Sequence, residues 1–200
     1  MTDFLRIFVP VYFILFFGIA FLGASLIVAK RIGENPNVLP KDDSAYGLIG
    51  RYFKLCLFGL FIYTLLLFFF PDYIFKTYLI EILHNRNLYY VGIFLMMISL
   101  IWVIIAQINM KNSWRIGIDE DSKTELITAG LFRFSRNPIF LGMIFSLIGF
   151  FLVLPTMISL LFLIFGFILI QIQIRLEEVF LQTQPGEMYL NYKKKVRRLL

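Results

Sequence analysis

The apolar residues of this chain gather into four long runs that contain no charged side chain. The longest run covers residues 137–174 and is 38 residues long. One bilayer crossing needs about 20 apolar residues, so this run is long enough for two helices. Pro155 marks the point where a helix would be interrupted. The other three runs each suit one crossing and cover Ile7–Ala29, Leu55–Pro71 and Asn87–Met110.

This pattern predicts an all-α, multi-pass transmembrane bundle of about five helices, forming a single membrane domain over residues 1–200. Three spans fall within residues 1–110, and residues 111–200 supply a loop, a helical hairpin and an amphipathic C-terminal helix. The first run is longer than the apolar part of a signal peptide and lacks a small-residue cleavage site, which favours a retained helix. With 60% hydrophobic residues, the chain is too apolar for a soluble globule.

The net charge of +6 is divided among alternate sides of the predicted spans. Of the 19 Lys and Arg residues, 16 lie in residues 30–54, 111–136 and 175–198. This division argues against a nucleic-acid partner, whose basic surface would be continuous. The positive-inside rule predicts an N-terminus outside, and these three segments in the cytoplasm.

The hairpin predicted over residues 137–174 would bring together two segments rich in charge, Thr124–Pro138 and Arg175–Arg198. The first segment ends in Asn137 and Pro138, residues that suit the start of a helix. A helix start offers free N–H groups and the positive end of a dipole to an anion, and Arg133 and Arg136 lie close by in sequence. The alternative is that these arginines only anchor the helix to lipid headgroups.

Two adjacent acidic residues, Glu177 and Glu178, follow the end of the apolar run. A carboxylate at a membrane edge is costly unless it is paired or lies in a polar cavity. Pairing with Arg175, three residues before Glu178, is one explanation. The other is a mixed-charge cleft with Arg133 and Arg136 that binds a zwitterionic ligand on the cytoplasmic side.

Cys56 and His84 are each the only residue of their type. A single cysteine excludes an internal disulfide, and an isolated histidine with no neighbouring ligand argues against a metal site.

The two charged segments carry motifs that resemble the isoprenylcysteine carboxyl methyltransferase and phospholipid methyltransferase group of membrane methyltransferases. The first motif reads "ELITAGLFRFSRNPIFLG" and the second "RLEEVFLQTQPGEMYLNYKKKV". The resemblance covers roughly residues 114–200. The matching residues of the first motif are Leu126, Gly130, Phe132, Arg136, Asn137, Pro138, Phe140 and Gly142, and those of the second are Glu177, Glu178, Gly186, Tyr189 and Tyr192.

The resemblance implies a cytoplasm-facing pocket for S-adenosylmethionine, which a lipophilic substrate reaches from the bilayer. Asn137 replaces the usual His of the family motif, and Phe132 and Phe140 stand where Tyr is frequent. These departures bear on pocket polarity and on the substrate more than on the cofactor. The residues implied to bind the cofactor are Leu126, Ile127, Gly130, Phe132, Asn137, Pro138, Phe140, Glu177 and Glu178.

The leading hypothesis is methyl transfer from S-adenosylmethionine to a lipophilic acceptor, and alignment in a water-poor site is the main catalytic contribution. On the resemblance alone, an isoprenylcysteine-like carboxylate or another small isoprenoid-like lipid ranks slightly ahead of a phospholipid amine, which favours O-methylation. Arg136 or Arg175 would orient a carboxylate, whereas Glu178 would be the candidate base for an amine.

Two alternatives remain open. Sterol reductases that use NADPH are similar in architecture over their C-terminal helices, although they have about twice as many spans. A non-catalytic protein that binds membrane lipid is the other alternative, since the motif His is absent. The basic tail, Lys193–Arg198, is expected to adhere to anionic lipid in either case.

Overall fold

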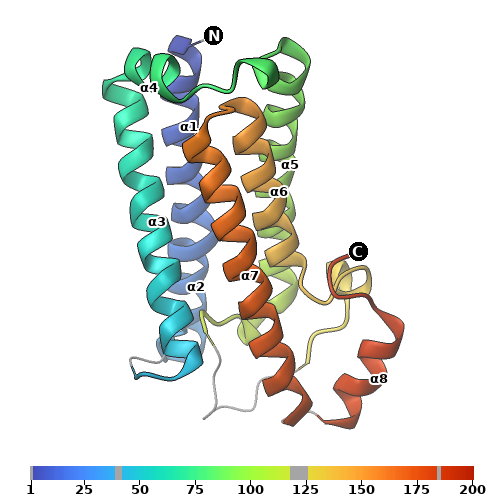
Figure 1. Cartoon of the computed structure of the whole chain (residues 1–200). Coiled ribbons are helices and arrows are strands. Elements are labelled where there is room, and N and C mark those ends of the chain that lie inside the picture. Colours follow the sequence, from blue (N-terminus) through green and yellow to red (C-terminus); the bar gives the residue numbers. More distant parts are fainter. Residues whose placement is uncertain (1, 39–41, 118–125, 184–185) are drawn as a thin grey trace.

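The computed structural model describes residues 2–38, 42–117, 126–183 and 186–200, and the elements in these ranges are helices joined by turns (Figure 1). Three short 3₁₀ turns cover Glu81–Leu83, Lys111–Ser113 and Gly130–Arg133. The longer elements are α1 (Thr2–Phe17), a π-helical segment (Gly18–Gly23), α2 (Ala24–Ile32), α3 (Ala45–Phe69), α4 (Pro71–Tyr78), α5 (Arg86–Met110), α6 (Pro138–Val153), α7 (Met157–Thr183) and α8 (Glu187–Lys195).

Four helices within the described ranges are long and apolar enough to cross a membrane: Asp3–Ile32, Ala45–Phe69, Arg86–Ser113 and Met157–Thr183. The first of these joins α1, the π-helical segment and α2 into one helix. The predicted all-helical, multi-pass bundle is therefore confirmed, and the chain is an integral membrane protein.

The fifth predicted span corresponds to α6, which is apolar but only 16 residues long. At 1.5 Å per residue it extends about 24 Å, less than the hydrocarbon thickness of a bilayer. It runs antiparallel to α5, with Gly142 against Val103 and Gly149 against Gly92. The predicted hairpin is present, because α6 ends at Val153 and α7 begins at Met157 after the turn at Pro155.

The short α6 leaves space beneath its first residue. The indole Nε1 of Trp102 donates to the Pro138 carbonyl at 2.9 Å, so α6 begins level with Trp102. α5 continues for another eight residues to Met110, about 12 Å further along its axis. The end of α5 thus forms one wall of a hollow that α6 does not fill.

Side chains fix the starts of two long helices. The hydroxyl of Ser44 accepts from the Gly47 N–H at the start of α3. The side chain of Asn85 accepts from the Leu88 N–H at the start of α5. Each bond satisfies a backbone donor that the helix itself leaves free.

The bundle core lies among α1, α3, α5 and α6, where Val9, Leu67, Met96 and Phe150 are fully buried. The core also holds a polar cluster around Tyr12. The Tyr12 hydroxyl lies 3.0 Å from the Ser99 hydroxyl and 2.8 Å from the Ser146 hydroxyl. These bonds satisfy the polar groups in a region without water and tie α1 to α5 and α6.

Candidate functional site

The hairpin brings its two charged ends into direct contact, as the sequence predicted. The Arg136 guanidinium, before α6, donates from Nη2 to Oε1 of Glu178, in α7, at 2.6 Å. Both side chains are buried, with exposed fractions of 8% and 5%. Burial of both charges in one pair strengthens their attraction and fixes the relative position of the two segments.

A second arginine completes this pair from the opposite side. Arg198 donates from Nη2 to Oε2 of Glu178 at 2.7 Å and from Nε to Oε1 at 3.1 Å. Its bond to Glu178 raises the pKa of Arg198, so its charge is secure. Glu178 therefore has guanidinium partners on both carboxylate oxygens. Its partners are Arg136 and Arg198, and not Arg175, which the sequence offered as one explanation.

The last turn of α8 and the segment after it dock on the residues just before α6. Nη1 of Arg136 donates to the carbonyls of Lys193 and Val196, both at 3.1 Å. The side-chain amide of Asn137 donates to the Arg198 carbonyl at 2.9 Å. Asn137 stands at the predicted N-cap position, but its side chain makes no capping bond there and binds the tail instead.

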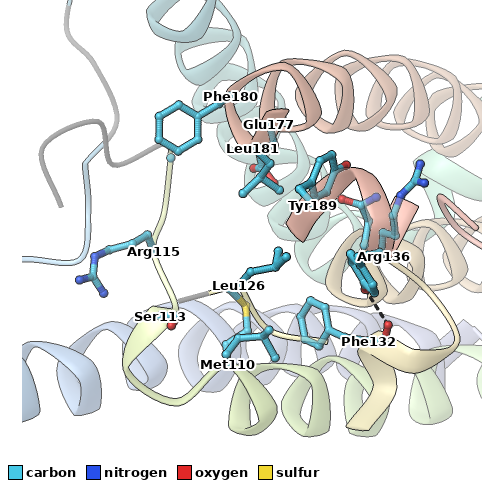
Figure 2. Close-up of a pocket in the computed structure, with 14 residues that line it drawn as sticks. Met110, Ser113, Arg115, Leu126, Phe132, Arg136, Glu177, Phe180, Leu181 and Tyr189 are labelled. Carbon is cyan, nitrogen blue, oxygen red and sulfur yellow. Dashed lines mark hydrogen bonds between the residues drawn. The ribbon is translucent and has the colours of Figure 1, made fainter. Parts of the chain in front are cut away.

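A pocket of about 160 Å³ lies at this end of the bundle, in the hollow below α6 (Figure 2). Residues from the end of α5, the segment before α6, the end of α7 and α8 contribute to its walls. The lining residues are Met110, Ser113, Arg115, Gly117, Leu126, Ile127, Phe132, Arg136, Asn137, Glu177, Phe180, Leu181, Tyr189 and Tyr192.

Six of the eleven residues predicted to bind the cofactor or to act in catalysis line this pocket, namely Leu126, Ile127, Phe132, Arg136, Asn137 and Glu177. They come from segments about 40 residues apart, and the hairpin is what joins them. Glu177 has its Oε1 bonded to the amide of Gln173 at 2.8 Å. Glu177, rather than Glu178, is therefore the carboxylate that faces the pocket.

Five other residues of the sequence prediction lie outside the pocket lining. Gly130 has a φ of +62° and a Cβ there would overlap Asn109, so this glycine shapes the turn before α6. Pro138 is the buried first residue of α6, and Phe140 packs against Ile144 and its apolar neighbours. Arg175 is exposed and bonded to Gln171, while Glu178 lies behind the pocket between its two arginines.

Other parts of the predicted charged segments are only partly covered by the structure. Arg133 is exposed and makes no ion pair among the described residues. Lys123 and Thr124 lie outside the described residues.

The loop after α2 bonds to Ile116, beside the pocket residues Arg115 and Gly117, through the Pro36 carbonyl and the Val38 N–H.

Two tyrosines of α8 form the side of the pocket next to Arg136. The Tyr192 hydroxyl donates to the Phe132 carbonyl at 2.6 Å, which attaches α8 to the segment before α6. Burial raises the pKa of Tyr189 and of Tyr192 to about 12. Both phenols therefore stay protonated at neutral pH.

The comparison with protein families gives a match over the same part of the chain. The model of the phospholipid methyltransferase family matches residues 87–187, from the start of α5 to the start of α8. The chain belongs to this family. Searches of curated proteins and of solved structures found no match. Together with its membrane-spanning helices, the family makes the chain a membrane methyltransferase.

The family match includes α5, α6 and α7, so it includes most of the pocket. It ends before Tyr189, Tyr192 and Arg198, whose contacts only the structure shows. Sequence reasoning also missed Phe180 and Leu181, although a signal was present. They follow Glu177 by three and four residues and so share its helix face.

Proposed function

We propose that this phospholipid methyltransferase family member transfers the methyl group of S-adenosylmethionine to a lipophilic acceptor bound in the pocket beside Glu177. The observation that carries the proposal is the position of the pocket. It lies at the end of the membrane-spanning helices and combines aromatic and aliphatic walls with one carboxylate and one guanidinium.

The lining suits a ligand that is both apolar and zwitterionic. Phe132 and Phe180 offer ring faces for an adenine and for a positive sulfur centre, a contact worth about 0.5–2 kcal/mol. Glu177 is the carboxylate that would hold an ammonium group. Leu126 and Ile127 add aliphatic surface to the lining.

The chemistry that S-adenosylmethionine supplies is an activated methyl group, and the role of the protein is then to align an acceptor with it. Arg136 is held rigidly by Glu178 and by two carbonyls, so it would orient the acceptor or the cofactor without moving. Alignment by fixed groups lowers the entropic part of the barrier.

The acceptor is proposed to be a small lipid whose apolar part lies in the bilayer. A carboxylate acceptor, as in an isoprenylcysteine, is already ionised and needs no base. An amine acceptor must lose a proton, and Glu177 is then the candidate base, since it lines the pocket while both oxygens of Glu178 are bound by arginines. O-methylation stays the first candidate, and the position of Glu177 supports N-methylation as the second.

The test uses the purified full chain in lipid nanodiscs. We expect S-adenosylmethionine and S-adenosylhomocysteine to raise the unfolding temperature, with a gain of about 2.7 kcal/mol at 100 times the dissociation constant. NADPH is the matched control and should have no effect. Stabilisation by NADPH alone would reject the proposal in favour of a reductase, and no effect of any of the three ligands would favour a lipid-binding protein.

The acceptor is then identified by transfer of a labelled methyl group. Two acceptors are compared, a prenylated N-acetylcysteine and phosphatidylethanolamine in the nanodisc. Label in the first shows O-methylation and label in the second N-methylation. Label in neither, from a protein that binds S-adenosylmethionine, would remove both acceptors.

A further inference from the structure

Two hydrogen-bond donors of the pocket residues are buried without a partner in the described part of the chain. They are the hydroxyl of Tyr189 and Nε of Arg136. Tyr189 is 1% exposed, and the Arg136 side chain is 8% exposed. Buried polar groups are nearly always hydrogen-bonded in native proteins, so two such donors at one pocket require an explanation.

The contacts around each donor hold it in place relative to the other described residues. The other nitrogens of Arg136 are fixed, with Nη1 bonded to two carbonyls and Nη2 to Glu178. The position of Tyr189 is fixed through Tyr192, one turn further along α8, which is bonded to the Phe132 carbonyl. Figure 2 shows Tyr189 and Arg136 on the same side of the pocket.

The chemistry of the two donors selects their ligand. Nε of a guanidinium has a hydrogen and no acceptor capacity. The Tyr189 phenol stays protonated because burial raises its pKa to about 12. Each donor therefore needs an acceptor oxygen, and a carboxylate offers two. Beside them, Arg136 and Arg198 together carry one positive charge more than the Glu178 carboxylate that they share, which favours an anion.

We propose that the Tyr189 hydroxyl and Arg136 Nε form a seat for a carboxylate oxygen of the ligand, an inference that rests on the proposed function. Glu177, elsewhere on the pocket wall, then binds the ammonium of the same zwitterion. The carboxylate comes either from the amino-acid part of the cofactor or from the acceptor. The Asn137 N–H, which the sequence offered for this role, already donates to the Ser135 hydroxyl.

The experiment compares Tyr189→Phe with Tyr192→Phe, two substitutions that each remove one phenol oxygen from the same helix. Tyr189→Phe removes a donor that has no partner among the described residues, so the unfolding temperature without ligand should stay the same or rise. Tyr192→Phe leaves the Phe132 carbonyl without its donor and should lower it. This difference in unfolding temperature would show that the Tyr189 hydroxyl makes no hydrogen bond that stabilises the fold.

Binding is then measured by calorimetry with two pairs of probes. The first pair is S-adenosylhomocysteine and its decarboxylated form, which keeps the ammonium. The second is a prenylated N-acetylcysteine acid and its methyl ester. Tyr189→Phe should weaken binding of one of the two acids by about tenfold or more, as expected for the loss of a hydrogen bond to a charged group. Binding of its counterpart without a free carboxylate should stay unchanged.

The pair that responds identifies the source of the carboxylate. Loss confined to S-adenosylhomocysteine assigns the seat to the cofactor, and loss confined to the prenylated acid assigns it to the acceptor. Equal affinities of the wild type and Tyr189→Phe for both acids overturn the inference, while the proposed function stands because the wild type binds S-adenosylhomocysteine. Failure of the wild type to bind S-adenosylhomocysteine overturns the proposed function and the inference with it.

Discussion

At the scale of single residues, the adjacent glutamates of α7 have different surroundings. Glu178 lies between Arg136 and Arg198, whereas Glu177 faces the pocket with only Gln173 as a described partner. Neighbouring positions on a helix point about 100° apart, so one of the pair turns toward the tail and the other toward the cavity. The structure therefore separates a carboxylate that holds the fold from one that is available to a ligand.

The two glutamates should respond differently to the same substitution. Glu178→Gln leaves the buried Arg136 without its counter-charge and should lower the free energy of unfolding by about 3 kcal/mol. Glu177→Gln should leave stability almost unchanged but weaken binding of S-adenosylhomocysteine. Thermal unfolding and calorimetry on both variants measure the two effects, and equal stability losses would contradict the separation.

The two arginines near the end of the tail form a second matched pair. Arg198 is bonded to Glu178, while Arg197 is exposed. Arg198→Gln should destabilise the protein by about 1 kcal/mol, a modest value because the side chain is 37% exposed, and should weaken ligand binding. Arg197→Gln should alter neither property. Identical behaviour of the two variants would return Arg198 to the lipid-facing role that the sequence suggested.

At Arg175, the prediction from the sequence and the arrangement in the structure differ. The sequence made it a candidate to orient the acceptor, but the structure places it outside the pocket, exposed and bonded to Gln171. Arg175→Gln should therefore leave methyl transfer within about twofold of the wild type. A loss of tenfold or more in kcat, without a change in stability, would return Arg175 to the catalytic group.

At the scale of helices, the position of the pocket depends on how closely α5 and α6 approach. A Cβ at Gly149 would lie 2.8 Å from the Gly92 carbonyl oxygen, closer than real contacts allow. Gly149→Ala should force the helices apart and cost about 1–3 kcal/mol. It should also weaken ligand binding, since α6 carries Asn137 and Arg136 at its start.

Gly59→Ala is the control for this change. A Cβ at Gly59 would meet the Phe162 ring at 3.5 Å, an ordinary contact. The substitution should raise stability by about 0.5–1 kcal/mol, because alanine is the better helix former. A comparable loss in both variants would show that any alanine in these helices is harmful and that the close approach has no special role.

The sequence predicted these elements to different degrees, for physical reasons. Pro138 and Pro155 act through local chemistry, so the start of α6 and the break before α7 could be predicted. The hollow below α6 could not be predicted, because it depends on how far α5 extends beside Pro138. The contacts of Arg198 and Tyr189 depend on where the tail folds back, and nothing local distinguishes Arg198 from Arg197.

At the scale of the whole molecule, the polar chemistry lies at one end of the bundle. The N-terminus, α4 and the turn between α6 and α7 lie at the end opposite α8 (Figure 1). The pocket, the tail and the ends of α2 and α5 share the end that carries most of the lysines and arginines. This segregation matches the alternation predicted from charge, while the direction of insertion stays a prediction.

The direction of insertion can be tested through the single cysteine. Cys56 is first replaced by Ser, and a single cysteine is then introduced at one of two exposed positions. Glu81 lies at the end of the bundle that holds the turn between α6 and α7, and Lys194 lies on α8. The positive-inside rule predicts that Glu81→Cys reacts with an impermeant maleimide in spheroplasts of a bacterial host, whereas Lys194→Cys reacts only after the membrane is opened. The reverse pattern would place the pocket outside the cytoplasm, where a cytoplasmic supply of S-adenosylmethionine could not reach it. Such a result would therefore contradict the proposed cofactor as well as the orientation.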